Sequence, residues 1–152
     1  MSDNDHTVRL HRVLRAPPAR VYKAFLDPHA KARWLPPYGF IGQVHEDDAR
    51  VGGKYRMSFT NFGTGGSHSF HGEYKELVPN ERLVYTDEFD DPGLPGVIKV
   101  TVELRAVTSG TELRITQENL PAVIPVDSCY VGWQESLQQL AKLVEPEIPD
   151  EG

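Results

Sequence analysis

The stretch DSCYVGWQESLQQLAKLV, residues 127–144, carries the clearest periodic pattern in the chain. Its large apolar side chains recur at steps of three and four residues, and they are Tyr130, Trp133, Leu137, Leu140 and Val144. This spacing aligns them along one side of an α-helix, and Asp127 and Ser128 can cap its first turn. Because the apolar side has to be buried, the stretch predicts a long helix packed against a larger apolar surface.

That surface is predicted to be a β-sheet formed by the residues that precede the helix. Residues 40–118 contain short segments separated by clusters of Gly, Pro, Asn and Asp. We expect six strands there, and the last two, residues 98–104 and 111–117, alternate apolar and polar side chains on either side of Ser109-Gly110. This pattern is typical of antiparallel hairpins rather than of parallel strands joined by helices.

The start of the chain adds one strand and two helices. Residues 8–14 alternate as a half-buried strand does, and residues 17–26 form an amphipathic helix that opens on two prolines. A second short helix opens at Asp27-Pro28 and ends before Pro36-Pro37. The order predicts an α+β fold in which a curved, seven-stranded antiparallel sheet wraps around the C-terminal helix. We expect one domain over residues 1–152, with its core at about 7–145 and an acidic tail at 146–152.

Charge and composition narrow the classes of partner and location. Twenty-two Asp and Glu residues against sixteen Lys and Arg residues give a net charge of -6, which opposes binding to nucleic-acid phosphates. No apolar run approaches the roughly 20 residues that cross a membrane. The single cysteine forms no internal disulfide, and residues 1–5 lack the features of an export signal. We therefore expect a cytoplasmic protein that neither binds nucleic acid nor spans a membrane.

Several sequence motifs resemble those of one known family. They are APPARVYKAF (16–25), WLPPYGF (34–40), PNERLVY (79–85), GTEL (110–113) and GWQESL (132–137). In this order they resemble bacterial homologues of the C-terminal domain of the heat-shock-protein-90 ATPase activator, within the SRPBCC superfamily. The resemblance covers roughly residues 7–145. It implies the helix-grip fold that START-like lipid-binding domains share with the birch-pollen allergen.

The resemblance implies several functions rather than one. The superfamily includes lipid carriers, polyketide cyclases or aromatases, hormone receptors and co-chaperone domains, and a fold alone does not fix an activity. The co-chaperone that gives the family its name has an additional N-terminal domain for chaperone contact, whereas this chain begins almost at its first strand. Contact with a chaperone is therefore an alternative that we do not favour, and formation of a homodimer is left open.

Apolar and aromatic residues from many segments are the main candidates for a site. A curved sheet closed by one helix often leaves space between the two, and such pockets are mostly apolar with a few polar groups. We predict that this space holds a small hydrophobic or aromatic, lipid-like molecule and that the loops after Trp34, Gly63 and Asp90 form its entrance. The predicted ligand-binding residues are Trp34, Tyr55, Met57, Phe59, Tyr85, Val100, Val102, Leu113, Tyr130, Trp133 and Leu137.

An enzyme that uses the same cavity is the alternative. In a cyclase or hydrolase, His71, Glu73 or Tyr85 would supply acid/base chemistry, but His71 and Glu73 are equally compatible with an ordinary polar ladder on a sheet face, which we favour. His68 and His71 are three residues apart on an expected strand and so point to opposite faces. Cys129 has no histidine near it in the sequence. We predict no catalytic residue, no metal and no cofactor.

Overall fold

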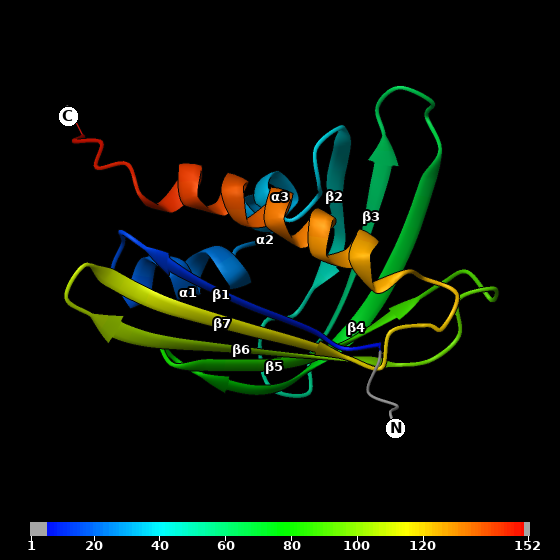
Figure 1. The fold of residues 1–152 in the computed structure, drawn as a ribbon, viewed down its shortest axis with the longest axis horizontal. Helices are drawn as coiled ribbons and strands as arrows, with labels where there is room; N and C mark the ends of the chain where they lie inside the picture. Colours follow the sequence, from blue (N-terminus) through cyan, green and yellow to red (C-terminus); the bar gives the residue numbers. More distant parts are fainter. Residues whose placement is uncertain (1–5, 151–152) are drawn as a thin grey trace.

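The elements of the fold follow the predicted order. The computed structural model describes residues 6–150, so residues 1–5 and the last two residues of the predicted acidic tail lie outside the described part. The strands of this part are β1 (Val8–Leu14), β2 (Phe40–Asp47), β3 (Lys54–Asn61), β4 (Ser67–Val78), β5 (Arg82–Phe89), β6 (Ile98–Val107) and β7 (Gly110–Glu118). Its helices are α1 (Pro18–Leu26), α2 (Pro28–Trp34) and α3 (Val126–Val144) (Figure 1).

The strands form one antiparallel sheet in the order β1-β7-β6-β5-β4-β3-β2. Because α1 and α2 connect β1 to β2, they carry the chain from one edge of the sheet to the other. The sheet curls, so that β3 and β4 rise beside α3 while α3 crosses the concave face (Figure 1). The structure therefore confirms the predicted α+β, helix-grip-like fold.

Two irregularities in strand pairing accompany the curl of the sheet. The β2–β3 register shifts between Val44 and Glu46, and the β4–β5 register shifts between Tyr74 and Glu76. An extra residue on one strand bends that strand and increases its local twist. Both shifts lie toward the ends of β2 and β4 that are away from the tip of the β3–β4 hairpin, so the bends contribute to the curl of the sheet there.

A proline stands at the start of each of the three helices: Pro17 and Pro18 at α1, Pro28 at α2 and Pro125 before α3. The Asp27 side chain accepts hydrogen bonds from the backbone N–H groups of His29 and Ala30, at 2.9 and 3.1 Å, and caps α2 as the sequence predicts. The predicted cap of α3 is corrected by the structure. Helix α3 begins at Val126 after Pro125 and has no side-chain cap, so Asp127 lies in its first turn instead, where the helix dipole favours a carboxylate.

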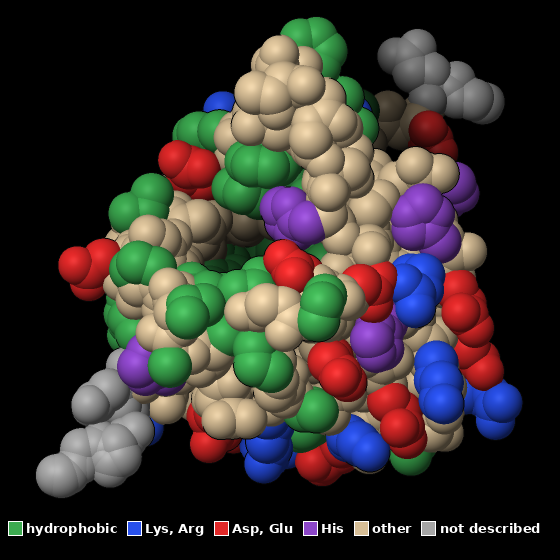
Figure 2. Space-filling view, turned by 90° about the vertical axis from the view of Figure 1, so that its right-hand side faces the viewer, with side chains coloured by type: hydrophobic (Ala, Val, Ile, Leu, Met, Phe, Trp, Pro, Cys, Tyr) green, Lys and Arg blue, Asp and Glu red, His purple; other side chains and the backbone are tan. Residues whose placement is uncertain are grey.

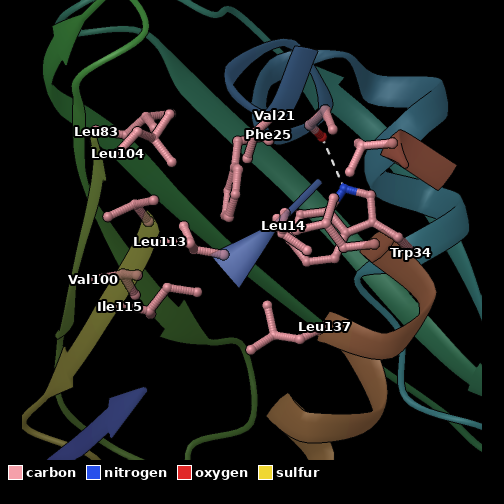
Figure 3. Close-up of a cluster of buried hydrophobic side chains, with 14 of the residues drawn as sticks. Leu14, Val21, Phe25, Trp34, Leu83, Val100, Leu104, Leu113, Ile115 and Leu137 are labelled. Carbon is pink, nitrogen blue, oxygen red and sulfur yellow. Dashed lines mark hydrogen bonds between the residues drawn. The ribbon is translucent and has the colours of Figure 1, made fainter. Parts of the chain in front are cut away.

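The main core lies between the helices and strands β1, β5, β6 and β7 (Figure 3). Leu113 and Ile115 of β7 face Leu137 of α3 across it. Trp34 is held by a 2.8 Å hydrogen bond from its indole N–H to the Ala24 carbonyl, and its ring meets the Phe25 ring edge-on, with centroids 4.9 Å apart. A second buried cluster, on β3 and β4, consists of Tyr55, Met57, Phe70 and Tyr74. Among residues 6–150, no helix is both long and apolar enough to span a membrane.

Candidate functional site

A cavity of about 480 Å³ lies between the sheet and the N-terminal half of α3. Its walls come from α1, α2, α3 and every strand from β2 to β7, and most of the lining side chains are aromatic or aliphatic. Figure 2 shows the hollow from outside, with hydrophobic side chains along it. Pro37 and Phe89 in the lining adjoin two of the loops predicted at the entrance, while Leu120 and Ile124 belong to a further segment that the sequence did not indicate.

Seven of the eleven predicted ligand-binding residues line this cavity. They are Trp34, Tyr55, Met57, Phe59, Tyr85, Val100 and Trp133. These residues come from α2, β3, β5, β6 and α3, segments that are distant in the sequence. The fold therefore brings them together around one space, whereas their contact with a ligand stays a prediction.

The other four predicted residues lie outside the lining, and we assign them to other roles. Val102, Leu113 and Leu137 are buried in the main core. Val102 follows Val100 on the same face of β6, so the cavity ends and the packed core begins between these two positions. The Tyr130 hydroxyl accepts a hydrogen bond from the Arg9 backbone N–H at 3.1 Å, which turns this ring toward the β1 edge.

Small side chains on α3 create the space. Ser128, Gly132 and Ser136 are four residues apart and line the cavity together with Cys129. A Cβ atom built on Gly132 would meet no atom within 4 Å. The Ser136 hydroxyl donates to the Leu35 carbonyl at 2.6 Å, so its polar group is satisfied. The cavity therefore faces a stripe of small residues, and the large apolar stripe beside it serves mainly to pack α3 onto the core.

A buried ion pair lies at the α2 end of the cavity. The Lys31 ammonium lies 3.1 Å from Asp47 Oδ2, and the two side chains are only 8% and 5% exposed. The ammonium also donates to the Tyr74 hydroxyl at 2.8 Å, and that hydroxyl donates to Asp47 Oδ1 at 2.6 Å. Asp47 Oδ2 has the ion pair but no well-aligned hydrogen bond. Burial lowers the pKa of Lys31, while Asp47 opposes this shift.

Asp87 places a second carboxylate on the cavity wall. Its Oδ1 atom is buried and has no hydrogen-bond partner among residues 6–150. The neighbouring Tyr55 hydroxyl has one proton, which it donates to the Thr86 carbonyl at 2.6 Å, so it does not satisfy this oxygen. Burial raises the pKa of Asp87 to about 7, although the charge of Lys31 opposes the rise. The side chain keeps partial exposure because it faces the hollow.

Three tyrosine rings surround these charges. The Tyr55 ring meets those of Tyr74 and Tyr85, with centroids 5.6 and 6.0 Å away, and the Lys31 ammonium lies 5.2 Å from the Tyr55 centroid. Gly72 makes this arrangement feasible, because a Cβ atom there would lie 1.9 Å from the Thr86 carbonyl oxygen and 2.7 Å from the Tyr55 ring. Burial raises the pKa of Tyr55 and of Tyr85, so both hydroxyls stay protonated at neutral pH.

His71 and Glu73 do not line the cavity. The His71 ring lies 2.6 Å from Asp90 Oδ1 and 3.5 Å from Glu88 Oε1, and Glu73 lies 3.4 Å from the Lys75 ammonium. These contacts are those of a polar ladder on the outer face of the sheet, so of the candidates for acid/base chemistry only Tyr85 reaches the cavity. Within the described residues, no three side chains of the types His, Cys, Asp and Glu form a group that could hold a metal ion.

Comparison with protein families identifies the chain. The family model of the activator of Hsp90 ATPase homolog 1-like protein matches residues 15–145, which is most of the chain. The chain belongs to this family. A structure that it resembles closely is that of a protein from Chromobacterium violaceum, which is 58% identical with a TM-score of 0.93 and covers 93% of this chain and 99% of its own.

More distant solved structures share the architecture and little of the sequence. A protein from Rhizobium leguminosarum is 26% identical with a TM-score of 0.75, over 93% of this chain and 95% of its own. An AHSA1-like protein from Aeromonas hydrophila, 20% identical with a TM-score of 0.74 over 91% and 92% of the two chains, shares the fold. None of the curated proteins matches the chain. The comparisons thus give the family and the fold, and a function has to be inferred from the residues that line the cavity.

The residues that sequence reasoning missed are mostly polar or small. Lys31, Asp47 and Asp87 lie on three different elements, and nothing in their local patterns indicates that they meet. Lys31 is part of a short amphipathic helix in which a lysine is normally solvent-exposed. One signal was available: Ser128, Gly132 and Ser136 recur every four residues beside the apolar stripe, a spacing that marks one face of a helix.

Proposed function

We propose that this protein binds a small hydrophobic or aromatic molecule in the cavity between α3 and the sheet. The observation that supports the proposal is the space itself, which is about 480 Å³ and is walled mainly by aromatic and aliphatic side chains. Small-molecule sites in proteins have volumes of roughly 300–1,000 Å³ and a predominantly apolar lining with few polar groups. A large apolar surface left unfilled costs stability, so a ligand that covers it gains binding free energy.

The position of Trp133 makes the proposal testable by fluorescence. Trp133 lines the cavity, and its indole N–H donates to Gln117 Oε1 at 2.9 Å. In a Trp34→Phe protein, Trp133 is the remaining tryptophan, since the chain has two. Titration with a panel of apolar probes, such as naphthalene, a fatty alcohol and a steroid, should shift its emission with saturation. The proposal fails if no probe binds, or if a probe binds and leaves the emission of Trp133 unchanged.

The natural ligand can be sought without choosing a probe. Native mass spectrometry of the protein purified from its own host should show the chain with an added mass of a small organic molecule. Release of that molecule by mild denaturation identifies its chemical class. The family assignment supports a ligand-binding domain in general, and a cytoplasmic location, expected from the sequence, would make a cytoplasmic metabolite or lipid the first candidate.

A further inference from the structure

We infer that the cavity selects an apolar molecule that carries a positively charged amine, which the Asp87 carboxylate binds. The inference rests on the proposed function, because it names the head group of the ligand that the same cavity holds. It is based on the charges in the wall, on the unpartnered oxygen of Asp87 and on the tyrosine rings around it.

The buried charges around Lys31 do not balance. Asp47 and Asp87 contribute two carboxylates and Lys31 contributes one ammonium, and of these three side chains Lys31 and Asp87 line the cavity. That ammonium already contacts Asp47 and the Tyr74 hydroxyl. Asp87 therefore keeps a buried oxygen without a hydrogen-bond donor, which is costly unless a proton or a ligand supplies one.

A cationic donor satisfies this site better than a neutral or anionic one. An amine with a positive charge forms a charge-assisted hydrogen bond with Asp87 and cancels the excess negative charge. The rings of Tyr55 and Tyr85 lie beside the same wall, and aromatic rings attract ammonium groups. A carboxylate ligand would instead face the Asp87 carboxylate, and the Lys31 ammonium is already paired with Asp47. Figure 2 shows acidic side chains closer to the opening than Lys or Arg side chains.

The remaining lining explains why the ligand has an apolar body. Val100, Met57 and Phe70 line the same cavity as Asp87. Two polar side chains of the lining already have partners, because Ser136 donates to the Leu35 carbonyl and Gln117 accepts from the Trp133 indole. An amine held at Asp87 therefore extends its carbon chain or ring across the cavity toward α3. The ligand class is an alkyl or arylalkyl ammonium rather than a free polyamine or a fatty acid.

Octylamine, octanol and octanoate test the inference, because they share one chain and differ in head group. At a pH above the pKa of Asp87, which is about 7, the full-length protein should bind octylamine roughly tenfold or more tightly than octanol, and octanoate most weakly. Asp87→Asn should reduce the preference for the amine to less than about threefold. Glu88→Gln, which removes the adjacent carboxylate on the outer face of β5, should keep the wild-type preference.

The outcomes separate this inference from the proposed function. If octanol binds but octylamine has no advantage, or if octanoate binds most tightly, the amine inference is overturned and the apolar-ligand proposal stands. If none of the three binds, both are overturned. Retention of the preference in Asp87→Asn, with a folded circular-dichroism spectrum, also overturns the role of Asp87.

A second measurement on the wild-type protein does not depend on the variant folding. Lowering the pH below the pKa of Asp87 protonates the carboxylate while octylamine stays charged, so the preference for octylamine over octanol should fall. The groups that face Asp87 from other elements are Lys31 of α2 and Tyr55 of β3. Burial lowers the pKa of Lys31 while Asp47 opposes this shift, and burial raises the pKa of Tyr55, so that its hydroxyl stays protonated over this range. A preference that is independent of pH contradicts the inference.

Discussion

Asp87 combines burial, a free oxygen and a position on an apolar cavity, and these features affect stability as well as binding. Its pKa is raised from 3.8 to about 7 in the folded protein. An acid with a higher pKa in the folded state binds more protons when folded, so its contribution to the free energy of unfolding falls as the pH rises through this interval. Above about pH 7 the full cost of the buried charge is present.

We therefore predict that Asp87→Asn is more stable than the wild-type protein at pH 8 and equally stable below about pH 4. The difference in the free energy of unfolding between the two proteins should grow as the pH rises from about 4 to 8, to at most on the order of 4 kcal/mol. Urea denaturation over a series of pH values measures it. A constant difference at all pH values would show that Asp87 has an ordinary pKa and that the amide acts only through packing.

Removal of the Lys31 charge is predicted to destabilise the protein, unlike removal of the Asp87 charge, because Lys31 is the buried partner of Asp47. Lys31→Met leaves Asp47 without its cation and should lower the free energy of unfolding by about 3–5 kcal/mol. Addition of Asp47→Asn should restore part of the loss, since the buried charge is then gone. The exposed pair Arg50–Asp48 provides the control: Arg50→Met should change stability by less than about 0.5 kcal/mol in the same denaturation experiment. Equal losses of stability in Lys31→Met and Arg50→Met would contradict the prediction that the buried ion pair matters more than the exposed one.

At the scale of elements, α3 has two neighbouring stripes of side chains: a large apolar stripe that packs on the core and a small-residue stripe that faces the cavity. Leu137 and Leu140 are buried in the main core, whereas Gly132 and Ser128 face the cavity. The large stripe was evident in the sequence, because apolar side chains at helical spacing have to be buried. The role of the small stripe cannot be predicted from the sequence, because the spacing of small residues does not tell whether a neighbour or an empty space lies opposite them. The predicted ligand-binding residues Tyr130 and Leu137 belong to the large stripe and lie beside the cavity lining.

Substitutions to alanine in the two stripes should change the stability of the protein in opposite directions. Gly132→Ala adds a methyl group into open space and removes a flexible glycine from the helix interior, so it should stabilise the protein by about 0.5–1 kcal/mol. Leu137→Ala should destabilise it by about 2–5 kcal/mol. Chemical denaturation of the two variants measures both changes. A loss of stability in Gly132→Ala would mean that the helix and the sheet are in contact at this position.

The β3–β4 hairpin illustrates a further prediction at this scale. Residues 63–67 at its tip are small and exposed, and they bury little surface. Their amide protons should exchange with solvent much faster than those of Val100 to Leu104 in β6. Hydrogen exchange followed by NMR compares the two segments directly. Equal protection would indicate that another part of the chain, or a second copy, covers the tip.

The whole molecule shows which properties follow from local patterns and which require the three-dimensional arrangement. Alternation in residues 98–117 and helical spacing in residues 127–144 predict the sheet, the long helix and their packing. The ion pair of Lys31 with Asp47, and the approach of Asp87 to it, depend on α2, β2 and β5 meeting through the curl of the sheet. These contacts join residues that are distant in the sequence, so the spacing within a single segment does not predict them.

The central claim is that the space beneath α3 is a binding site, and a side chain that fills the space tests it most directly. Gly132→Phe projects a ring into the cavity, while Val131→Phe places the same ring on the solvent side of the helix, where Val131 is 55% exposed. Isothermal titration of both folded variants with an apolar probe that binds the wild-type protein measures the dissociation constant. We predict that Gly132→Phe weakens binding at least tenfold, roughly 1.4 kcal/mol, and that Val131→Phe changes it less than about twofold. Wild-type affinity in Gly132→Phe would contradict the claim that the ligand occupies this cavity.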